Sequence, residues 1–302
     1  MENGTPNLLF APADTRALSE ASRARRVARW LGHPSLLFGL VLCIGITLAS
    51  VAAPLLTHYN PDLQNANAVF SKPTAQHLMG TDSFGRDVLT RVLYGGRTTI
   101  LASALVVLLG APVGSALGLV AGYFRGVAGV VIMRFMDLLL AFPGILLALT
   151  VSAILGPGLL NGVLAVAVVS VPAYARVVEG ATVEIRSVPY VEAAITTGAG
   201  PLHIMWRHVL PNVISGIVVL STSWLGIAVL WIASLGYLGL GVQPPQAEWG
   251  AMLNDGQSYI SIAWWISFFP GLLLSLFVVA TNLLGDGLRD RLDPTQGRRR
   301  GG

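Results

Sequence analysis

Six apolar stretches recur along this chain, and each is close to the length that crosses a bilayer. They occupy residues 36–56, 98–122, 131–155, 158–177, 212–240 and 260–285. A helix needs about 20 predominantly apolar residues to span the hydrocarbon core, and it satisfies its own backbone hydrogen bonds where water is absent. The stretches therefore predict an all-α polytopic membrane protein with six transmembrane helices.

The composition supports the same fold class. Of the 302 residues, 54% are hydrophobic and 11% are charged, which is typical of a polytopic membrane protein and not of a soluble domain. Residues 36–56 follow a basic segment and contain small residues at 49–53, as a cleavable signal peptide would. The apolar stretch is longer than a usual signal-peptide core, and further spans follow, which favours a retained membrane anchor.

Basic residues are unevenly distributed between the two sides that six spans define. Six spans place both termini on one side, and fifteen of the 19 Arg and Lys residues lie on that side. The other side holds Lys72, Arg86, Arg91 and Arg97. Cytoplasmic segments carry the excess of positive charge, so this pattern predicts cytoplasmic termini. We expect the basic residues 1–35 to contact membrane lipid and not nucleic acid.

A polar island at residues 177–211 interrupts the apolar runs. Ser187 is a candidate N-cap, and Pro189 is suited to the first turn of a short helix. Gly198 would end that helix, because glycine accepts the positive φ that follows many helices. The island therefore predicts a structured loop.

A second short helix is expected to start at Pro201 and to end at Pro211, where the chain re-enters the membrane. A helix of about ten residues is about 15 Å long, which is too short to span a bilayer. A helix of this length is also only marginally stable in water when it is isolated. The two short helices therefore predict docking against a partner surface.

One glycine in every four residues marks the second span. Small residues at this spacing leave a flat face along which another helix backbone can approach in lipid. We interpret this face as a helix-packing stripe, with a substrate groove as the alternative. The stripe consists of Gly110, Gly114, Gly118 and Gly122.

Prolines lie inside three spans, at Pro143, Pro172 and Pro270. Each frees a backbone carbonyl and can bend its helix, so gating bends and irregular packing are both open. The charged residues of the spans lie near their ends, which leaves no ion relay at mid-membrane and argues against a self-sufficient secondary transporter. They are Arg134, Asp137, Arg176 and Asp286.

The sequence lacks the motifs of an ATPase or a metallohydrolase. The one lysine, Lys72, lies between Ser71 and Pro73, which does not fit a Walker A loop. His203 and His208 are five residues apart, and at that spacing they do not share the face of an α-helix as a metal pair would. We therefore expect no catalytic site, cofactor site or metal site in this chain.

The polar island contains E-A-A at residues 192–194, followed by Gly198, Ile204 and L-P at residues 210–211. This part of the island resembles the EAA loop of bacterial ABC-importer inner-membrane permeases. The pattern is E-A-A, three residues, G, and later I and L-P. In that family the loop forms a coupling helix that docks into a cleft of the cytoplasmic ATPase. The matching residues are Glu192, Ala193, Ala194, Gly198, Ile204, Leu210 and Pro211.

Residues 77–100 read HLMGTDSFGRDVLTRVLYGGRTTI. This segment resembles the GTDxxGRDxxSR signature of C-type permeases in dipeptide, oligopeptide and nickel importers. Residues 236–253 and 282–294 are similar to the same subfamily, so the likeness covers about residues 36–294. Taken alone, GTDSFG reads as a turn, and RDVLTRVLYGGR reads as an interfacial helix with Val88, Val92 and Leu93 toward lipid. The signature residues are Gly80, Thr81, Asp82, Gly85, Arg86, Asp87 and Arg91, with Thr90 where the pattern usually has Ser.

The resemblance implies a type I ABC importer permease fold in a bacterial cytoplasmic membrane. It implies a cytoplasmic tail at 1–35, a first transmembrane helix with a periplasmic loop at 36–96, and a cytoplasmic tail at 289–302. The five-helix core would occupy 97–288 and contain the EAA loop at 178–211.

The implied function is peptide import driven by ATP, with this chain as half of the translocation pathway. The implied partners are a homologous B-type permease, two nucleotide-binding ATPase subunits or one fused ATPase, and an extracytoplasmic solute-binding protein. ATP and Mg would bind to the ATPase and not to this chain. The alternatives are a stand-alone secondary carrier or channel, a membrane scaffold, and nickel or another small solute as cargo.

Overall fold

The computed structural model describes residues 34–292, and the elements within that range are helical. In chain order they are α2 (Pro34–Val51), α3 (Ala53–Leu56), η1 (Ala66–Ala68), α4 (Val88–Phe124), α5 (Gly126–Leu140), α6 (Gly144–Leu155), α7 (Leu159–Arg186), α8 (Pro189–Thr196), α9 (Pro201–Ile204), η2 (Met205–Val209), α10 (Leu210–Tyr237), α11 (Trp249–Gln257) and α12 (Trp265–Leu292). Most of the two predicted tails, 1–35 and 289–302, lies outside the described residues. The described parts of these tails are helical, because residues 34–35 begin α2 and residues 289–292 end α12.

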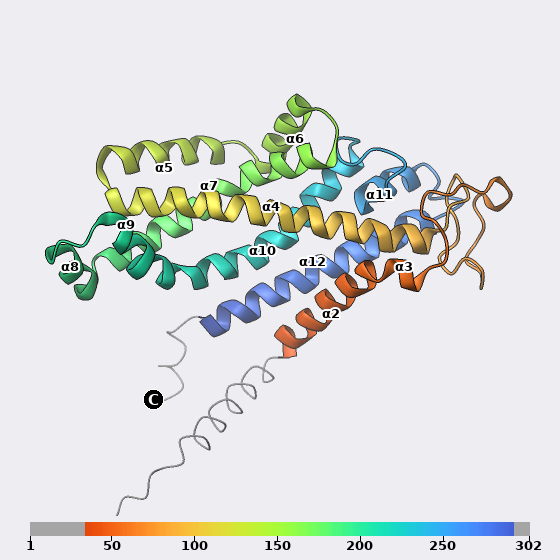
Figure 1. Ribbon diagram of the computed structural model, residues 1–302. Helices are drawn as coiled ribbons and strands as arrows, with labels where there is room; N and C mark the ends of the chain where they lie inside the picture. Colours follow the sequence, from red (N-terminus) through yellow and green to blue (C-terminus); the bar gives the residue numbers. More distant parts are fainter. Residues whose placement is uncertain (1–33, 293–302) are drawn as a thin grey trace, which may run out of the picture.

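The long helices account for the predicted spans. Within residues 34–292, five helices are long and apolar enough to cross a membrane, and the count reaches six if the bent pair α5 and α6 forms one span. They run alongside one another as a bundle (Figure 1). The all-α polytopic fold class is therefore confirmed.

Helices α4 and α7 form the most extensive helix pair of the bundle. The four glycines of the stripe lie on the α4 face that meets α7. A Cβ atom added at Gly118 would lie 2.4 Å from the carbonyl oxygen of Ala175, and one at Gly114 would lie 2.5 Å from that of Val171. Only a residue without a side chain allows the two backbones to approach this closely.

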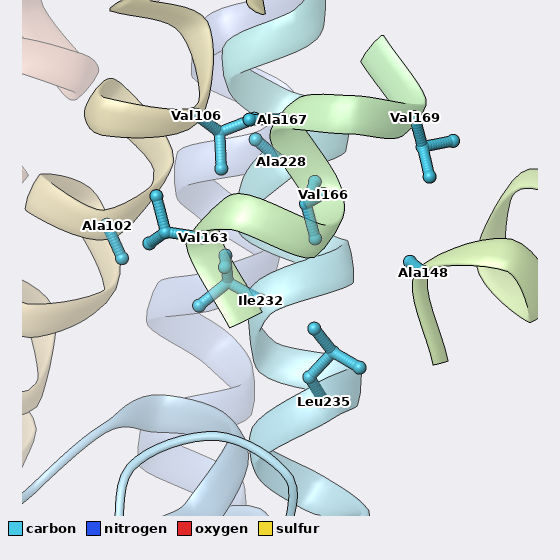
Figure 2. Close-up of a cluster of buried hydrophobic side chains, with 10 residues drawn as sticks. All are labelled: Ala102, Val106, Ala148, Val163, Val166, Ala167, Val169, Ala228, Ile232 and Leu235. Atoms are coloured by element: carbon cyan, nitrogen blue, oxygen red, sulfur yellow. The ribbon is translucent and has the colours of Figure 1, made fainter. Parts of the chain in front are cut away.

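Valine and alanine side chains fill the centre of the bundle. Val163 and Val166 of α7 pack with Val106 of α4 and with Ala228 and Ile232 of α10, and all five are at most 2% exposed (Figure 2). Close packing of small and β-branched residues fixes the relative positions of these three helices. The two ends of the bundle are thereby held at fixed positions.

The second span begins earlier than its apolar stretch. Helix α4 starts at Val88, ten residues before the predicted start at 98, because Asp87 caps it by accepting a hydrogen bond from the Thr90 amide at 2.8 Å. Val88 and Val92 are fully buried, and they pack with Met252 and Trp265. The alternative of an interfacial helix with these valines toward lipid is therefore wrong.

The third span is broken. Helices α5 and α6 meet at an angle of 91°, and Pro143 is the residue directly before α6. Pro172 and Pro270 lie inside α7 and α12, which remain continuous, as does α4 around Pro112. Of the three prolines inside the predicted spans, Pro143 coincides with a break in the helix.

The bundle has two different ends (Figure 1). Helices α8 and α9 lie at one end, which we call the α8 end. The loop of residues 57–87 and helix α11 lie at the opposite end, which we call the α11 end. The two segments that the sequence singles out therefore lie at opposite ends of the molecule.

Candidate functional site

Helix α8 begins and ends close to the predicted positions. Pro189 is in its first turn, and Gly198 follows its C-cap with φ +86°. A side chain on Gly198 would meet no atom within 4 Å, so its left-handed backbone is the reason for glycine at this position. Both predictions are confirmed.

Two other predictions about this loop are wrong. Ser187 does not cap α8, because its hydroxyl donates at 2.7 Å to the Glu184 carbonyl at the end of α7 and Val188 takes the N-cap position. Pro211 does not end a helix. It lies in the first turn of α10, where a proline needs no amide partner, and the helical path runs from Pro201 to Tyr237.

The path from α9 to α10 contains a π-helical turn, η2, at Met205–Val209. A π-turn places residues five apart over one another, so the ring centroids of His203 and His208 lie 5.9 Å apart. The expectation that these histidines do not share a face is therefore wrong. Within residues 34–292, no group of three or more His, Cys, Asp or Glu side chains is placed to hold a metal ion.

Buried side chains hold the α8 end on the bundle. Val191, Ile204 and Val209 are fully buried and pack with Tyr123 of α4 and Val178 of α7. The EAA-like residues therefore divide into two groups. Ile204 faces the interior and Leu210 is half-buried.

The other EAA-like positions lie mostly on the surface of the α8 end. Glu192, Ala193 and Gly198 are exposed, and Ala194 is half-buried. Large apolar side chains of the same short helices are also exposed: Leu202 and Trp206 are each 70% exposed and Tyr190 is 48% exposed. Exposed apolar groups beside a carboxylate on a rigid support are typical of a protein-binding surface.

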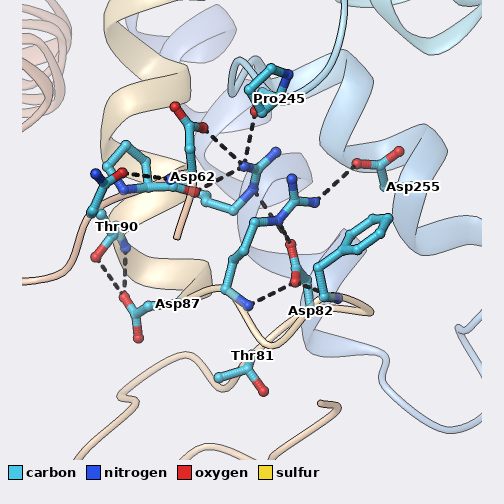
Figure 3. A network of polar contacts seen from close by, with 12 residues as sticks. Asp62, Thr81, Asp82, Asp87, Thr90, Pro245 and Asp255 are labelled. Atoms are coloured by element: carbon cyan, nitrogen blue, oxygen red, sulfur yellow. Dashed lines mark hydrogen bonds and ion pairs between the residues drawn. The ribbon is translucent and has the colours of Figure 1, made fainter. Parts of the chain in front are cut away.

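At the α11 end, three of the signature residues, Asp82, Arg86 and Arg91, form a buried charge network (Figure 3). Oδ2 of Asp82 lies 2.6 Å from Nε of Arg86 and 3.5 Å from Nε of Arg91. Oδ1 of Asp82 accepts the amides of Phe84 and Arg86, each at 2.9 Å. Asp82, Arg86 and Arg91 are each at most 4% exposed. Buried charges are tolerated because they are paired in this way.

Arg91 connects segments that are far apart in the sequence. Its Nη1 donates to the carbonyl oxygens of Pro61 at 3.0 Å and of Pro245 at 3.2 Å. The start of α4, the loop before it and the loop before α11 therefore share one guanidinium group.

The other signature residues shape the loop before α4. Gly80 has φ +74°, and an added Cβ would lie 2.6 Å from the indole nitrogen of Trp265. Gly85 has φ +71°, and an added Cβ would lie 1.9 Å from the Asn65 carbonyl oxygen. The hydroxyl of Thr81 donates to the Ala68 carbonyl, and Asp87 caps α4. These residues build the surface without exposing their own side chains.

Glu248 completes the α11 end, and the sequence analysis missed it. It is 1% exposed, and it caps α11 by accepting the amides of Gly250 at 3.0 Å and Ala251 at 2.9 Å. The adjacent Trp249 donates from its indole nitrogen to the Val92 carbonyl at 2.9 Å. The sequence feature that could have pointed to this buried residue is a glutamate next to a tryptophan in the segment between two apolar spans.

Comparisons with known proteins identify similar chains. Residues 114–298 match the family described as "Binding-protein-dependent transport system inner membrane component". The glutathione transport system permease protein GsiD of Pectobacterium atrosepticum is 44% identical over 262 residues, which cover 87% of each chain. The di/tripeptide transport system permease protein DppC of Pseudomonas aeruginosa is 42% identical over 291 residues, which cover 94% of this chain and 96% of the relative.

A solved structure has a similar fold. The MetNI methionine ABC transporter in an inward-facing conformation contains a chain with a TM-score of 0.54 and 21% sequence identity. The likeness covers 67% of the present chain and 96% of that chain. The family match covers more than half of the sequence, and relatives above 40% identity cover most of it. The chain belongs to the family of inner membrane components of binding-protein-dependent transport systems.

Proposed function

We propose that this chain is a permease subunit of an ATP-driven importer of dipeptides or oligopeptides. In this proposal it pairs with a homologous B-type permease to form the translocation pathway. The relatives named for glutathione and for di- and tripeptide transport support the cargo, because they align over most of the chain. Nickel is the alternative cargo within the same subfamily.

The α8 surface carries the proposal of ATPase coupling. Glu192 and Ala193 are exposed on α8, whereas Val191 of the same helix is buried in a cluster with side chains of α4 and α7. Ile204 of the neighbouring α9 is buried in the same cluster. A helix fixed to two long helices transmits a displacement to them without bending. We propose that Glu192 presents its carboxylate to the ATPase cleft. The small side chains of Ala193 and Ala194 allow the ATPase to approach closely, and Gly198 forms the turn after α8.

The distribution of charge supports the orientation that we propose. Arg186 and Arg207 lie at the α8 end, and Arg289 and Arg291 lie in the last turn of α12. The positive-inside rule supports a cytoplasmic α8 end with both termini on the same side. The α11 end, with its signature residues, would then receive the solute-binding protein. ATP and Mg would be bound by separate or fused ATPase partners, and the glycine stripe would hold the permease helices together.

Reconstitution tests the proposal. The permease pair, its ATPase and its binding protein are placed in liposomes, and uptake of a labelled dipeptide is measured with and without ATP. We expect uptake to require all components and ATP. Gradient-driven uptake by this chain alone would identify a secondary carrier instead, and ATP-dependent uptake of nickel without dipeptide uptake would replace the cargo.

A further inference from the structure

A cavity of about 430 Å³ opens between α7, α10 and α12 in the half of the bundle nearer the α8 end. Its lining includes Ser215, Gly216 and Ser223 of α10 and Asp286 and Arg289 of α12. The volume lies within the range of about 300–1,000 Å³ that is usual for small-molecule sites.

Glycines mark where α10 and α12 touch beside the cavity. A Cβ added at Gly226 would lie 2.5 Å from the Thr281 hydroxyl, and one at Gly285 would lie 3.0 Å from the Ser223 hydroxyl. These glycines hold the helices in close contact. Nearly three turns before Gly226 on α10, a Cβ at Gly216 would meet nothing within 4 Å. The cleft is therefore closed at one end by glycine contacts and open at the other.

Four polar side chains on the cavity wall have no partner of their own. Within residues 34–292, Ser215, Ser223, Asp286 and Arg289 make no hydrogen bond or ion pair. Asp286 and Arg289 are three residues apart on one helix, a spacing at which opposite charges commonly pair. Here both side chains are exposed and line the cavity, and within residues 34–292 they pair neither with each other nor with a third residue.

The chemistry of this wall is that of a receptor for a zwitterion. We propose that Asp286 binds an ammonium group, that Arg289 binds an oxyanion, and that Ser215 and Ser223 supply hydroxyl contacts to the same ligand. Carboxylate to ammonium and guanidinium to carboxylate or phosphate are strong charge-assisted pairs. The Cβ atoms of residues three apart on a helix lie about 5–6 Å apart. An extended dipeptide separates its charged ends by roughly 7 Å, so the long arginine side chain can reach the second end.

Two molecules present this chemistry at a membrane protein. One is a free dipeptide, and this assignment rests on the proposed function as a peptide importer. The other is the headgroup of phosphatidylethanolamine, which carries an ammonium and a phosphate. The site itself requires only the paired charges, so the experiment has one arm for each source.

The first arm measures binding of radiolabelled dialanine to the assembled permease and ATPase complex in nanodiscs of phosphatidylglycerol, without binding protein. We expect saturable binding, weakened about 10-fold or more in Asp286→Asn and in Arg289→Gln. Blocked peptides identify which end each residue binds. N-acetyl-dialanine, which lacks the ammonium group, should compete poorly with labelled dialanine for the wild type. In Asp286→Asn it should compete as well as unlabelled dialanine does. Dialanine amide, which lacks the carboxylate, should likewise compete poorly for the wild type and as well as dialanine for Arg289→Gln.

The second arm measures phosphatidylethanolamine that co-purifies from mixed membranes. If phosphatidylethanolamine is enriched with the wild type and not with either charge variant, and dialanine does not bind in the first arm, the site binds the lipid headgroup. Gly216→Leu should abolish binding of either ligand by filling the open cleft, and Gly45→Leu is the matched control, because an added Cβ there also meets nothing within 4 Å.

The inference would be overturned if the wild type bound neither dialanine nor phosphatidylethanolamine. It would also be overturned if the two charge variants bound these ligands as well as the wild type does. Uptake in the complete reconstituted system separates this failure from that of the proposed function. Intact ATP-driven dipeptide uptake without binding at this cavity would contradict only the zwitterion site. Absent uptake in the wild type would contradict the import function.

Discussion

The hydroxyl of Thr99 donates a 2.9 Å hydrogen bond to Oε1 of Glu248, a residue 149 positions later in the chain. Both side chains are at most 1% exposed, so this bond joins the first turns of α4 to the N-terminus of α11 in the protein interior. The α11 end is therefore held by a buried carboxyl group at its centre.

Stability should depend on the protonation of Glu248. Burial raises the pKa of this carboxyl above the ordinary value of 4.5, and the amides of Gly250 and Ala251 and the Thr99 hydroxyl oppose the shift. A raised pKa in the folded state means that the folded protein binds the proton more tightly than the unfolded chain. The resulting stability is present below pH 4.5 and is lost as the pH rises through the folded-state pKa.

We expect wild type to lose unfolding free energy relative to Glu248→Gln as the pH is raised from about 4 to about 8. Thermal unfolding of the two proteins in detergent, compared at each pH, measures this difference and cancels the other titrating groups. If the difference in unfolding free energy stays constant with pH, or grows in favour of wild type, the three hydrogen-bond donors outweigh burial in setting the pKa of Glu248.

The guanidinium of Arg91 should contribute strongly to stability. Arg91→Gln leaves Asp82 with one fewer cation and frees the carbonyls of Pro61 and Pro245, and removal of one partner from a buried charge network costs about 3–5 kcal/mol. The control is Arg97→Gln, six residues later on the same helix. Arg97 is exposed beside the Tyr94 ring, and its loss should cost less than about 1 kcal/mol. Equal unfolding midpoints for the two variants would contradict the assignment.

The glycine stripe should not tolerate even a methyl group. Gly118→Ala places its Cβ 2.4 Å from a backbone carbonyl oxygen of α7, so α4 and α7 must separate, at a cost of about 1–3 kcal/mol. Gly180→Ala is the control, because an added Cβ there meets nothing within 4 Å. Unfolding midpoints should fall for the first variant and stay level or rise for the second. A substrate groove would instead give normal stability and impaired uptake for Gly118→Ala.

The turn at Gly198 should affect coupling more than folding. Gly198→Val forces a β-branched residue into a left-handed conformation, which costs about 1–2 kcal/mol, whereas Gly198→Asn is tolerated there. Glu192→Lys reverses the exposed charge of α8. In the reconstituted complex, Gly198→Val and Glu192→Lys should hydrolyse more ATP per dipeptide imported, while Gly198→Asn stays near wild type. Normal ratios in all three variants would remove the coupling role from α8.

The spans were predictable because apolar length is a local property of the sequence. The bounds of α8 were predictable for a similar reason, since Pro189 and Gly198 act on their own backbone. Ser187 was misassigned because a serine between two helices can cap either one, and its hydroxyl bonds back to Glu184.

The α11 end was harder to predict, because its contacts are long-range. The partners of Arg91 and Glu248 include residues about 150 positions away, and nothing in the local pattern at 86–97 distinguishes a buried helix start from an interfacial helix. The π-turn at Met205–Val209 was likewise hidden, because hydrophobic spacing in so short a segment does not separate a π-turn from an α-turn.

The central claim is that α8 lies in the cytoplasm against an ATPase subunit. The exposed Ile195 of α8 is replaced by cysteine in a Cys43→Ser background, which leaves one thiol in the chain. A membrane-impermeant maleimide should label this thiol in inside-out vesicles and not in intact cells, and a bifunctional reagent should crosslink it to the ATPase subunit. Labelling from the outside of intact cells, or crosslinks only to the solute-binding protein, would contradict the account.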